Sequence, residues 1–257
     1  MTVWGVCMVR DEADIIGWTL PRMAAQLDGV IVADNRSSDE TPTILCELSY
    51  KWPIHVVEDT EPAYMQSEKM TALAWQAAER GAEWIVPFDA DEVWWSPLGP
   101  LRDVVRHDDA DVIEAKVFDH VVSSMDDVSL SDPVKRITRR RPSALRLPKV
   151  ACRVRPGLVV EQGNHGARYP GDVLQVGQEI EVRHFPYRSV EQMARKARNG
   201  AEAYRAAGDR LPETTGQHWR DYGRLLDERG IEAIEEIFMT WFYGGNTVDD
   251  PCPVPMP

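Results

Sequence analysis

The chain has 257 residues, and its 42 acidic and 29 basic side chains give a formal net charge of −13. This excess of negative charge argues against nucleic acid or an anionic membrane as a partner. The four cysteines are scattered and form no CxxC pair, which argues against a zinc module or a disulfide framework. No apolar run approaches the length of a membrane span, so we expect a soluble protein of the reducing cytoplasm.

The first hundred residues alternate short apolar runs with segments of helical spacing. This alternation predicts helices at 15–27, at 67–81 and after a cap at Ser38 or Asp39, and strands at 3–9, 29–35, 55–59 and 84–88. Because strands that alternate with helices form βαβ units, we expect a parallel sheet. The apolar runs lack a period of two, as expected of strands covered on both faces. Pro87 conflicts with a central position, because proline cannot donate a ladder hydrogen bond.

The pattern is looser after residue 100. Strands are predicted at 111–122 and 181–189, with shorter strands in 149–167 and a loop-rich stretch at 123–148. Ser189 and Gln192 have the spacing of a capping box, which predicts a helix that continues through residue 207. A last helix is predicted at 230–242. Its apolar face would pack inward or serve a dimer, and consists of Ile231, Ile234, Ile237, Phe238 and Trp241.

Three acids crowd together in the segment PFDADEVWW, residues 87–95. If the fourth strand stays extended, Asp89 and Asp91 point to the same side, with α-carbons roughly 6.6–6.8 Å apart. In α/β sheets, ligands collect beyond the carboxyl ends of the strands. Oxygen donors at this spacing suit Mg²⁺ or Mn²⁺, whose usual companion in proteins is a phosphate group. The alternative is a solvated acidic turn.

Two further strands end in polar residues at the same edge of the predicted sheet. The second strand ends in VADNRSSDET, with Asp34 and Asn35 at its exit, and the first ends in VRDEAD, with Arg10 and Glu12. A carboxylate at such a position can bond a base N–H or a ribose hydroxyl, and the helix start behind it is a natural anion site. The alternative for Asp34 is simple turn formation.

These motifs resemble a known family. IVADNRSSDET is similar to the DDGSxDGT segment of family 2 glycosyltransferases, and FDADE resembles their DxD motif, with a similar spacing between the two. The resemblance covers roughly residues 3–95. The later segments KVACR, GNHGA and RHFPYRSVEQMARKARNGA resemble a bacterial branch of these enzymes more loosely. Asn35 departs from the pattern, since the family commonly has a second Asp there.

The resemblance implies an α/β fold of the GT-A type, a nucleotide-binding mixed sheet flanked by helices with a helical C-terminal extension. Residues 1–188 would form the catalytic domain, divided into a nucleotide-sugar half (1–100) and an acceptor half (101–188), and 189–257 would form the extension. The implied activity is an inverting, metal-dependent transfer of a sugar from a nucleotide-diphosphate sugar, preferably a UDP-sugar, to a hydroxyl group. The acceptor would be a small molecule or a glycan.

The resemblance also implies roles for individual residues. Asp34 would hold the base or ribose, Asp89 would lie near the ribose and the metal, and Asp91 would ligate Mn²⁺ or Mg²⁺. His184, at the end of EVRHF, is the expected further metal ligand, with a core histidine as the alternative. The predicted nucleotide-sugar site comprises Arg10, Glu12, Asp34, Asn35, Asp89 and Lys149.

An inverting transfer needs a general base for the acceptor hydroxyl. The segment VVEQGNHGA offers Glu161 and His165, and Asp126 or Asp127 are alternatives. Basic residues near the helix that follows Ser189 could stabilise the departing diphosphate or form a solvated face, namely Arg188, Arg195 and Lys196. Trp94 and Trp95 could stack on a sugar or pack in the core.

Two other classes of protein remain open at this stage. A sugar nucleotidyltransferase also joins a nucleotide-binding sheet to a metal-binding acid. Such enzymes usually carry a glycine-rich, basic loop after the first strand, whereas this chain has the acidic VRDEAD there. A non-catalytic carbohydrate-binding or scaffold protein with the same fold is the third class.

Overall fold

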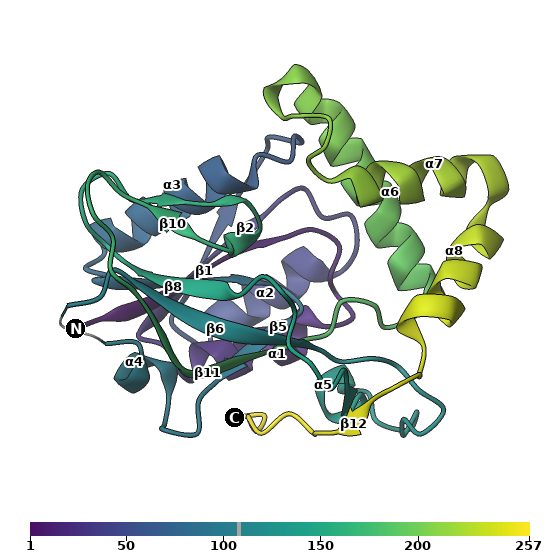
Figure 1. The fold of residues 1–257 in the computed structure, drawn as a ribbon, viewed down its shortest axis with the longest axis horizontal. Coiled ribbons are helices and arrows are strands. Elements are labelled where there is room, and N and C mark those ends of the chain that lie inside the picture. The colour runs from purple at the N-terminus through teal and green to yellow at the C-terminus, as the bar shows by residue number, and fades with distance from the viewer. Residues whose placement is uncertain (107–108) are drawn as a thin grey trace.

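One mixed sheet of 8 strands forms the centre of the molecule (Figure 1), in a computed structural model that describes residues 1–106 and 109–257. The strand order across the sheet is β3-β2-β1-β4-β8-β6-β11-β5. The strands are β1 (Val3–Val9), β2 (Gly29–Asp34), β3 (Ile54–Glu58), β4 (Trp84–Asp89), β5 (Glu92–Trp95), β6 (Val112–Asp119), β8 (Lys149–Arg153) and β11 (Gln175–His184).

The directions of these strands place many polar residues at one end of the sheet, where the parallel strands have their carboxyl ends. Strands β1 to β4 are parallel, β8 is antiparallel to both β4 and β6, β11 is parallel to β6, and β5 is antiparallel to β11. Therefore β1, β2, β4, β6 and β11 end where β5 and β8 begin. We call this the site edge; it carries Arg10, Asp34, Asp89, Glu92, Asp119, Lys149 and His184.

Helices cover both faces of the parallel half of the sheet. Helices α1 (Ile16–Ala24), α2 (Thr41–Ser49) and α4 (Leu101–Val104) share one apolar cluster with the β1 residue Cys7, and α3 (Gln66–Glu79) shares another with the neighbouring Val6. Successive β1 side chains thus enter cores on opposite faces. This two-sided burial explains the apolar runs without a period of two.

Three helices form an extension beside the site edge (Figure 1): α6 (Val190–Ala207), α7 (Gln217–Arg229) and α8 (Ile231–Ile237). The predicted cap at Ser189 is confirmed, because its hydroxyl accepts a hydrogen bond of 3.1 Å from the backbone N–H of Gln192. The Gln192 side chain accepts from the N–H of Arg188 (3.1 Å) instead of from that of Ser189, so the predicted capping box is only half formed. Helix α7 was not predicted: its sequence carries many charges, and the helical spacing of Trp219, Tyr222 and Leu226 was not recognised.

The last predicted helix is only partly correct. Ile234 and Phe238 are buried against Met193 of α6, as expected. However, Ile231 is 41% and Trp241 is 68% exposed, so the inward packing predicted for these two is wrong. After Ile237 the chain continues as a π-helical segment, η3 (Phe238–Phe242), whose wider turn rotates Trp241 away from the packed face.

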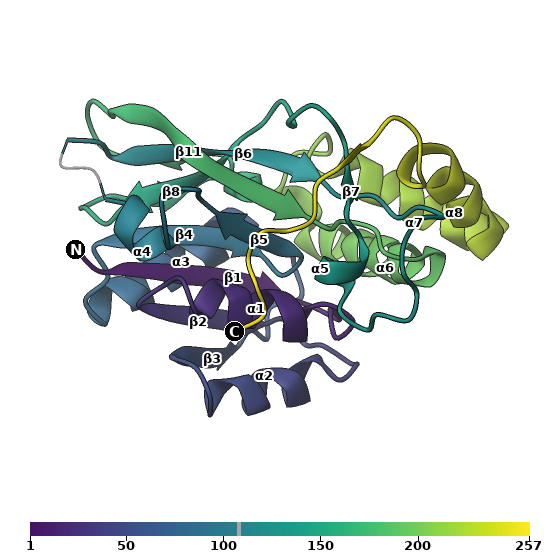
Figure 2. The ribbon, with the colours of Figure 1, turned by 90° about the horizontal axis from the view of Figure 1, so that it is seen from below.

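Shorter elements complete the fold: α5 (Pro133–Arg136), β7 (Arg139–Arg140), β9 (Val159–Val160), η1 (Gln162–Asn164), β10 (Ala167–Arg168), η2 (Gly208–Arg210) and β12 (Val248–Asp249). The C-terminal tail pairs β12 with β7 and then runs back to α1 (Figure 2). There Arg22 donates a hydrogen bond of 3.0 Å to the carbonyl of Val254. The tail therefore ties the end of the chain to its first helix.

The predicted fold class, a mixed α/β sheet flanked by helices with a helical C-terminal extension, is confirmed. Element bounds differ: β11 begins well before the predicted 181, and β5 follows the acidic turn without having been predicted. Pro87 does lie in β4, but β8 pairs only with Trp84 and Ile85, so beyond these residues β4 has a ladder on one side only. In the described part of the chain, no helix is long and apolar enough to cross a membrane.

Candidate active site

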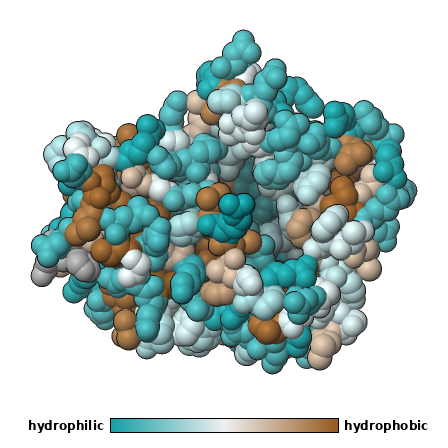
Figure 3. Space-filling model, in the orientation of Figure 1, coloured by the Kyte–Doolittle hydropathy of each residue, from teal (hydrophilic) through white to brown (hydrophobic). Residues whose placement is uncertain are grey.

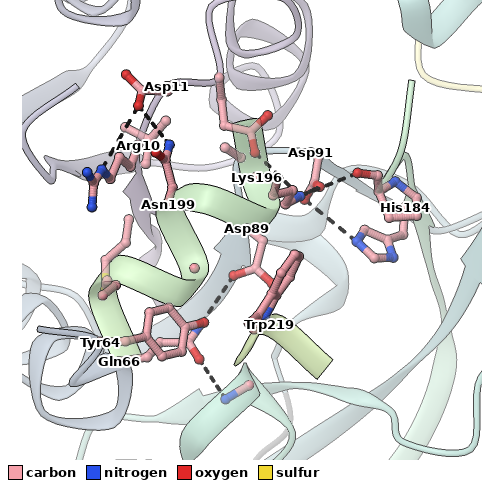
Figure 4. A pocket seen from close by; sticks show the side chains of 18 of the residues that line it. Arg10, Asp11, Tyr64, Gln66, Asp89, Asp91, His184, Lys196, Asn199 and Trp219 are labelled. Atoms are coloured by element: carbon pink, nitrogen blue, oxygen red, sulfur yellow. Dashed lines mark hydrogen bonds and ion pairs between the residues drawn. The ribbon is translucent and has the colours of Figure 1, made fainter. Parts of the chain in front are cut away.

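A cavity of about 420 Å³ lies between the site edge and the helical extension, within the size range of ligand pockets. Figure 3 shows it as a hollow near the middle of this face, and Figure 4 shows its interior. Its walls come from the ends of β1 and β4, the loop after β3, the segment around Gly163 and His165, and helices α6 and α7. Residues from the sheet and from the C-terminal helices thus line one space.

The sheet register explains why the charged residues meet there. Met8 is paired with Asp89, and His184 is paired with both Asp119 on one side and Glu92 on the other. Because these strands end or begin at the same edge, their polar terminal residues converge without requiring a long loop. The predicted convergence of polar strand ends is therefore a direct result of the strand order.

Asp89 is held by residues from three different segments. Its Oδ2 lies 2.5 Å from Nζ of Lys149, and its Oδ1 accepts hydrogen bonds from Gln66 (3.3 Å) and Asn164 (3.1 Å). Lys149 also lies 2.9 Å from Oε1 of Glu92, a fully buried residue. Burial raises the pKa of Glu92, against the opposing charge of Lys149. A lysine from the sheet itself thus compensates the acids at this end of the motif.

Asp91 is compensated from a different direction. It is 2% exposed, and Lys196 of α6 donates a hydrogen bond to its Oδ2. His184 Nε2 lies 3.7 Å from Oδ1, and an Arg188 nitrogen lies 3.8 Å from Oδ2. Burial acts to raise the pKa of Asp91, but the charges of Lys196, His184 and Arg188 hold it well below its ordinary value. Asp91 is therefore an ionised acid at the junction of sheet and extension.

His184 has the arrangement of a histidine positioned by a carboxylate. Its Nδ1 lies 2.7 Å from Oδ1 of Asp119, while its Nε2 is the nitrogen nearer to Asp91. Burial acts to lower the pKa of His184, but Asp91 and Asp119 raise it to about 9. A carboxylate behind the outer ring nitrogen is the usual support of a metal-binding imidazole.

The expected divalent metal fits Asp91 and His184 better than it fits Asp89. Both oxygens of Asp89 are already engaged by Lys149, Gln66 and Asn164. Oδ1 of Asp91 and Nε2 of His184 face one another instead. In residues 1–106 and 109–257, no group of three or more His, Cys, Asp or Glu side chains is placed to hold a metal ion.

The loop after β1 joins the sheet to the extension. Asp11 has a φ of +53°, in the left-handed region, and its Oδ1 accepts a hydrogen bond of 2.6 Å from the Ser38 N–H. Its Oδ2 accepts another, of 2.7 Å, from Asn199 of α6. Glu12 pairs with Arg188, which follows β11. The acids of VRDEAD therefore organise protein groups around the cavity.

The structure brings eight of the predicted site residues to the cavity wall and leaves two away from it. Asp34 accepts a 3.4 Å hydrogen bond from the Ser37 N–H, and Glu161 pairs with Arg168 at 3.1 Å; neither lines the cavity. The roles predicted for all ten remain predictions. The eight that line it are Arg10, Glu12, Asn35, Asp89, Asp91, Lys149, His165 and His184.

His165 is positioned by the polypeptide around it. Its Nδ1 lies 2.7 Å from the carbonyl oxygen of Pro148, so Nδ1–H donates and Nε2 keeps a lone pair in the neutral ring. Burial lowers the pKa of His165, which favours that neutral form. Gly163 has a φ of +76°, and an added Cβ would lie 2.6 Å from Nε2 of His165. The glycine thus permits a close approach of the imidazole to the backbone.

The aromatic part of the cavity wall was not predicted from the sequence. Tyr64, Tyr204 and Trp219 line the cavity, and the rings of the two tyrosines are 4.8 Å apart. An added Cβ at Gly200 would lie 3.0 Å from the Trp219 ring, so this helical glycine allows α6 and α7 to pack closely. A glycine inside a helix costs about 1 kcal/mol relative to alanine. The presence of Gly200 in a helical sequence was therefore the signal from which close helix packing could have been predicted.

The two tryptophans after the acidic motif do not line the cavity. Trp94 is fully buried in the core, so the packing alternative is the correct one for this residue. Trp95 lies under the guanidinium of Arg183, 5.5 Å from the ring centroid. The aromatic surface that the sequence suggested next to the acids is instead supplied by α6, α7 and the loop before α3.

Comparison with known proteins gives structural likenesses only. No family model matches the chain, and no curated protein matches it. It is similar to the crystal structure of S. aureus TarS 1-349 in complex with UDP-GlcNAc (15% identity, 89% of this chain and 73% of that chain, TM-score 0.47). It is also similar to a mycobacterial protein (13% identity, 83% and 76%, TM-score 0.36). Likeness at these values defines neither a family nor a ligand for this chain.

Proposed function

We propose that this protein is a glycosyltransferase of the GT-A type that moves a sugar from a nucleotide-diphosphate sugar, preferably a UDP-sugar, to an acceptor hydroxyl. The observation that carries the proposal is the cavity itself. It joins the strand-end acids Asp89 and Asp91 to the cationic side chains of Arg10, Arg195 and Lys196. Cations around a cavity at the carboxyl ends of parallel strands suit a diphosphate.

The proposal includes a divalent metal, Mn²⁺ or Mg²⁺, held by Asp91 and His184. Bound there, it would supply positive charge to the departing diphosphate as a Lewis acid. Asp119 would orient His184 through its hydrogen bond to Nδ1. Asp89, whose oxygens are engaged by Lys149, Gln66 and Asn164, would remain a fixed carboxylate near the ribose.

His165 is the better of the two predicted bases. Its ring is held at Nδ1 by Pro148 and lines the cavity, whereas Glu161 pairs with Arg168 outside it. In the proposed reaction Nε2 takes the proton of the acceptor hydroxyl while the hydroxyl oxygen attacks the anomeric carbon, whose bond to the diphosphate breaks so that the nucleoside diphosphate leaves with the electron pair. The aromatic wall of Tyr64, Tyr204 and Trp219 offers ring faces on which the acceptor can stack.

The first test is calorimetric binding of UDP with and without Mn²⁺. We expect the parent protein to bind UDP more tightly with Mn²⁺ and Asp91→Asn to lose this dependence. Asp227→Asn makes the same substitution at an exposed position of α7 and should behave as the parent. Failure of UDP, GDP and dTDP alike to bind would contradict the proposal. Binding of a UDP-sugar without turnover in the presence of metal and acceptors would favour the non-catalytic alternative.

A further inference from the structure

Lys196 connects the helical extension to the buried acid at the centre of the site (Figure 4). Its Nζ donates a hydrogen bond to Oδ2 of Asp91 and lies 3.4 Å from Oε1 of Glu12. The Lys196 side chain is 25% exposed and lines the cavity, whereas the Asp91 side chain is 3% exposed. The ammonium group therefore lies between a buried carboxylate and the space that a ligand would enter.

Among the other cations near these acids, Lys149 and Arg188 are held more firmly. Lys149 is 7% exposed and contacts both Asp89 and Glu92, so its departure would leave two carboxylates without its compensating positive charge. Arg188 is 2% exposed and is bonded to Glu12, Asp14 and the carbonyl of Phe185. Lys196 also contacts two carboxylates, but its side chain is 25% exposed, so its flexible four-carbon stem and rotatable donors have more room to move. Among these three cations it is the one that can most readily exchange partners.

We propose that Lys196 is an exchangeable cation. Before the donor binds, it neutralises Asp91 through Oδ2; when a divalent metal bound by Oδ1 and His184 supplies the positive charge instead, Lys196 moves to the diphosphate of the donor. This inference rests on the proposed function, because it requires a diphosphate and a metal in the same cavity. The exchange keeps the buried Asp91 paired in both states, which avoids the large cost of an uncompensated buried charge.

The exchange makes metal and nucleotide binding mutually dependent. Without nucleotide, a metal ion competes with Lys196 for Asp91 and binds weakly. With nucleotide present, the displaced ammonium gains phosphate oxygens as partners, so the metal binds more tightly. By thermodynamic linkage the metal must then increase the affinity for nucleotide by the same factor. Removal of Lys196 should abolish this coupling by strengthening metal binding alone and weakening nucleotide binding.

The test compares the parent, Lys196→Met and Arg198→Met by calorimetry with Mn²⁺ alone and with UDP at saturating Mn²⁺. For Lys196→Met we expect Mn²⁺ alone to bind about tenfold tighter and UDP about tenfold weaker, each near 1.4 kcal/mol. Arg198→Met removes one positive charge from an exposed position on the same helix. Its affinities for Mn²⁺ and for UDP should stay within about twofold of those of the parent. This variant therefore controls for the loss of one positive charge from α6 in general.

An unchanged Mn²⁺ affinity in Lys196→Met would overturn the proposal, because it would mean that the lysine does not compete for Asp91. Lys196→Gln, which keeps a polar end group, is the second variant should the methionine variant fail to fold. If UDP binds to no variant and not to the parent, the proposed function fails. The Mn²⁺ comparison still decides in that case whether Lys196 competes.

Discussion

The site edge of the sheet and the helical extension contribute different kinds of residue to one cavity. The sheet brings acids at its strand ends, and one of them, Asp89, is compensated by Lys149 from the neighbouring part of the same sheet. The extension brings Lys196 and the aromatic rings of Tyr204 and Trp219. Asp91 belongs to the sheet side, yet the lysine that bonds it comes from α6.

This difference shows that Asp89 and Asp91 depend on different parts of the chain. The Asp89–Lys149 pair forms whenever β4 and β8 are in place. The Asp91–Lys196 pair needs the extension to dock, and docking is secured by Arg188, which bonds Glu12 and Asp14 from the loop after β1. Docking of the extension therefore also completes the charge compensation of Asp91.

Arg188→Met should produce the largest effect, because it breaks the link between the two regions. It leaves the buried acids Glu12 and Asp91 and the exposed Asp14 with less compensation, and loss of one partner of a buried ion pair costs about 3–5 kcal/mol. We expect the free energy of unfolding in urea to fall by this amount. The proposed UDP binding should weaken in parallel.

The control for this variant is Arg224→Met, in which the arginine of an exposed pair with Asp221 is removed. Exposed ion pairs contribute about 0–1 kcal/mol. Equal losses of stability in the two variants would mean that the extension docks independently of Arg188. The dependence of Asp91 on the extension would then need another cause.

The sheet side of the comparison was largely predictable from sequence, and the extension was not. Apolar runs that end in DADE, VRDEAD and VADN identify strand ends, and parallel strands necessarily bring their ends to one edge. Lys196, Tyr204 and Trp219 lie on helices whose local pattern states only which face is apolar. Their position over the cavity follows from tertiary docking through Arg188 and Asn199, which no local pattern encodes.

The pKa of His120 reports whether water is excluded from the protein interior at the end of β6. His120 follows β6, is 1% exposed and contacts the Phe185 ring. Burial lowers its pKa to about 4, against about 6.5 in the unfolded chain. Its contribution to stability is therefore fully present above pH 6.5 and is lost as the pH falls through 4. The expected loss is about 3 kcal/mol between pH 7 and pH 4.

The measurement is the free energy of unfolding of the parent and of His120→Asn at these two pH values. The asparagine amide can still donate to the Ile137 carbonyl, the partner of Nδ1, but does not titrate. The variant should therefore lose about 3 kcal/mol less than the parent on acidification. His55→Asn removes an exposed histidine as the control. Identical acid sensitivity of the parent and His120→Asn would show that this part of the sheet opens to water.

The smallest of these effects concerns the aromatic contribution of the extension. Trp219→Ala removes one ring face from the cavity wall and leaves the acids and their lysines in place. If this wall binds the acceptor, the KM for the acceptor should rise by roughly fivefold, near 1 kcal/mol, at an unchanged affinity for UDP. Steady-state kinetics at saturating donor measure the KM, and calorimetry measures the affinity.

Trp241→Ala is the matched control, because this tryptophan is 68% exposed and lies outside the cavity. It should leave both quantities unchanged. A weaker affinity for UDP in Trp219→Ala, with the KM for the acceptor unaltered, would assign the ring to the donor instead. The extension would then bind only the donor, with Lys196 contacting the diphosphate and Trp219 contacting another part of the same molecule. The acceptor would be recognised by the segment around His165.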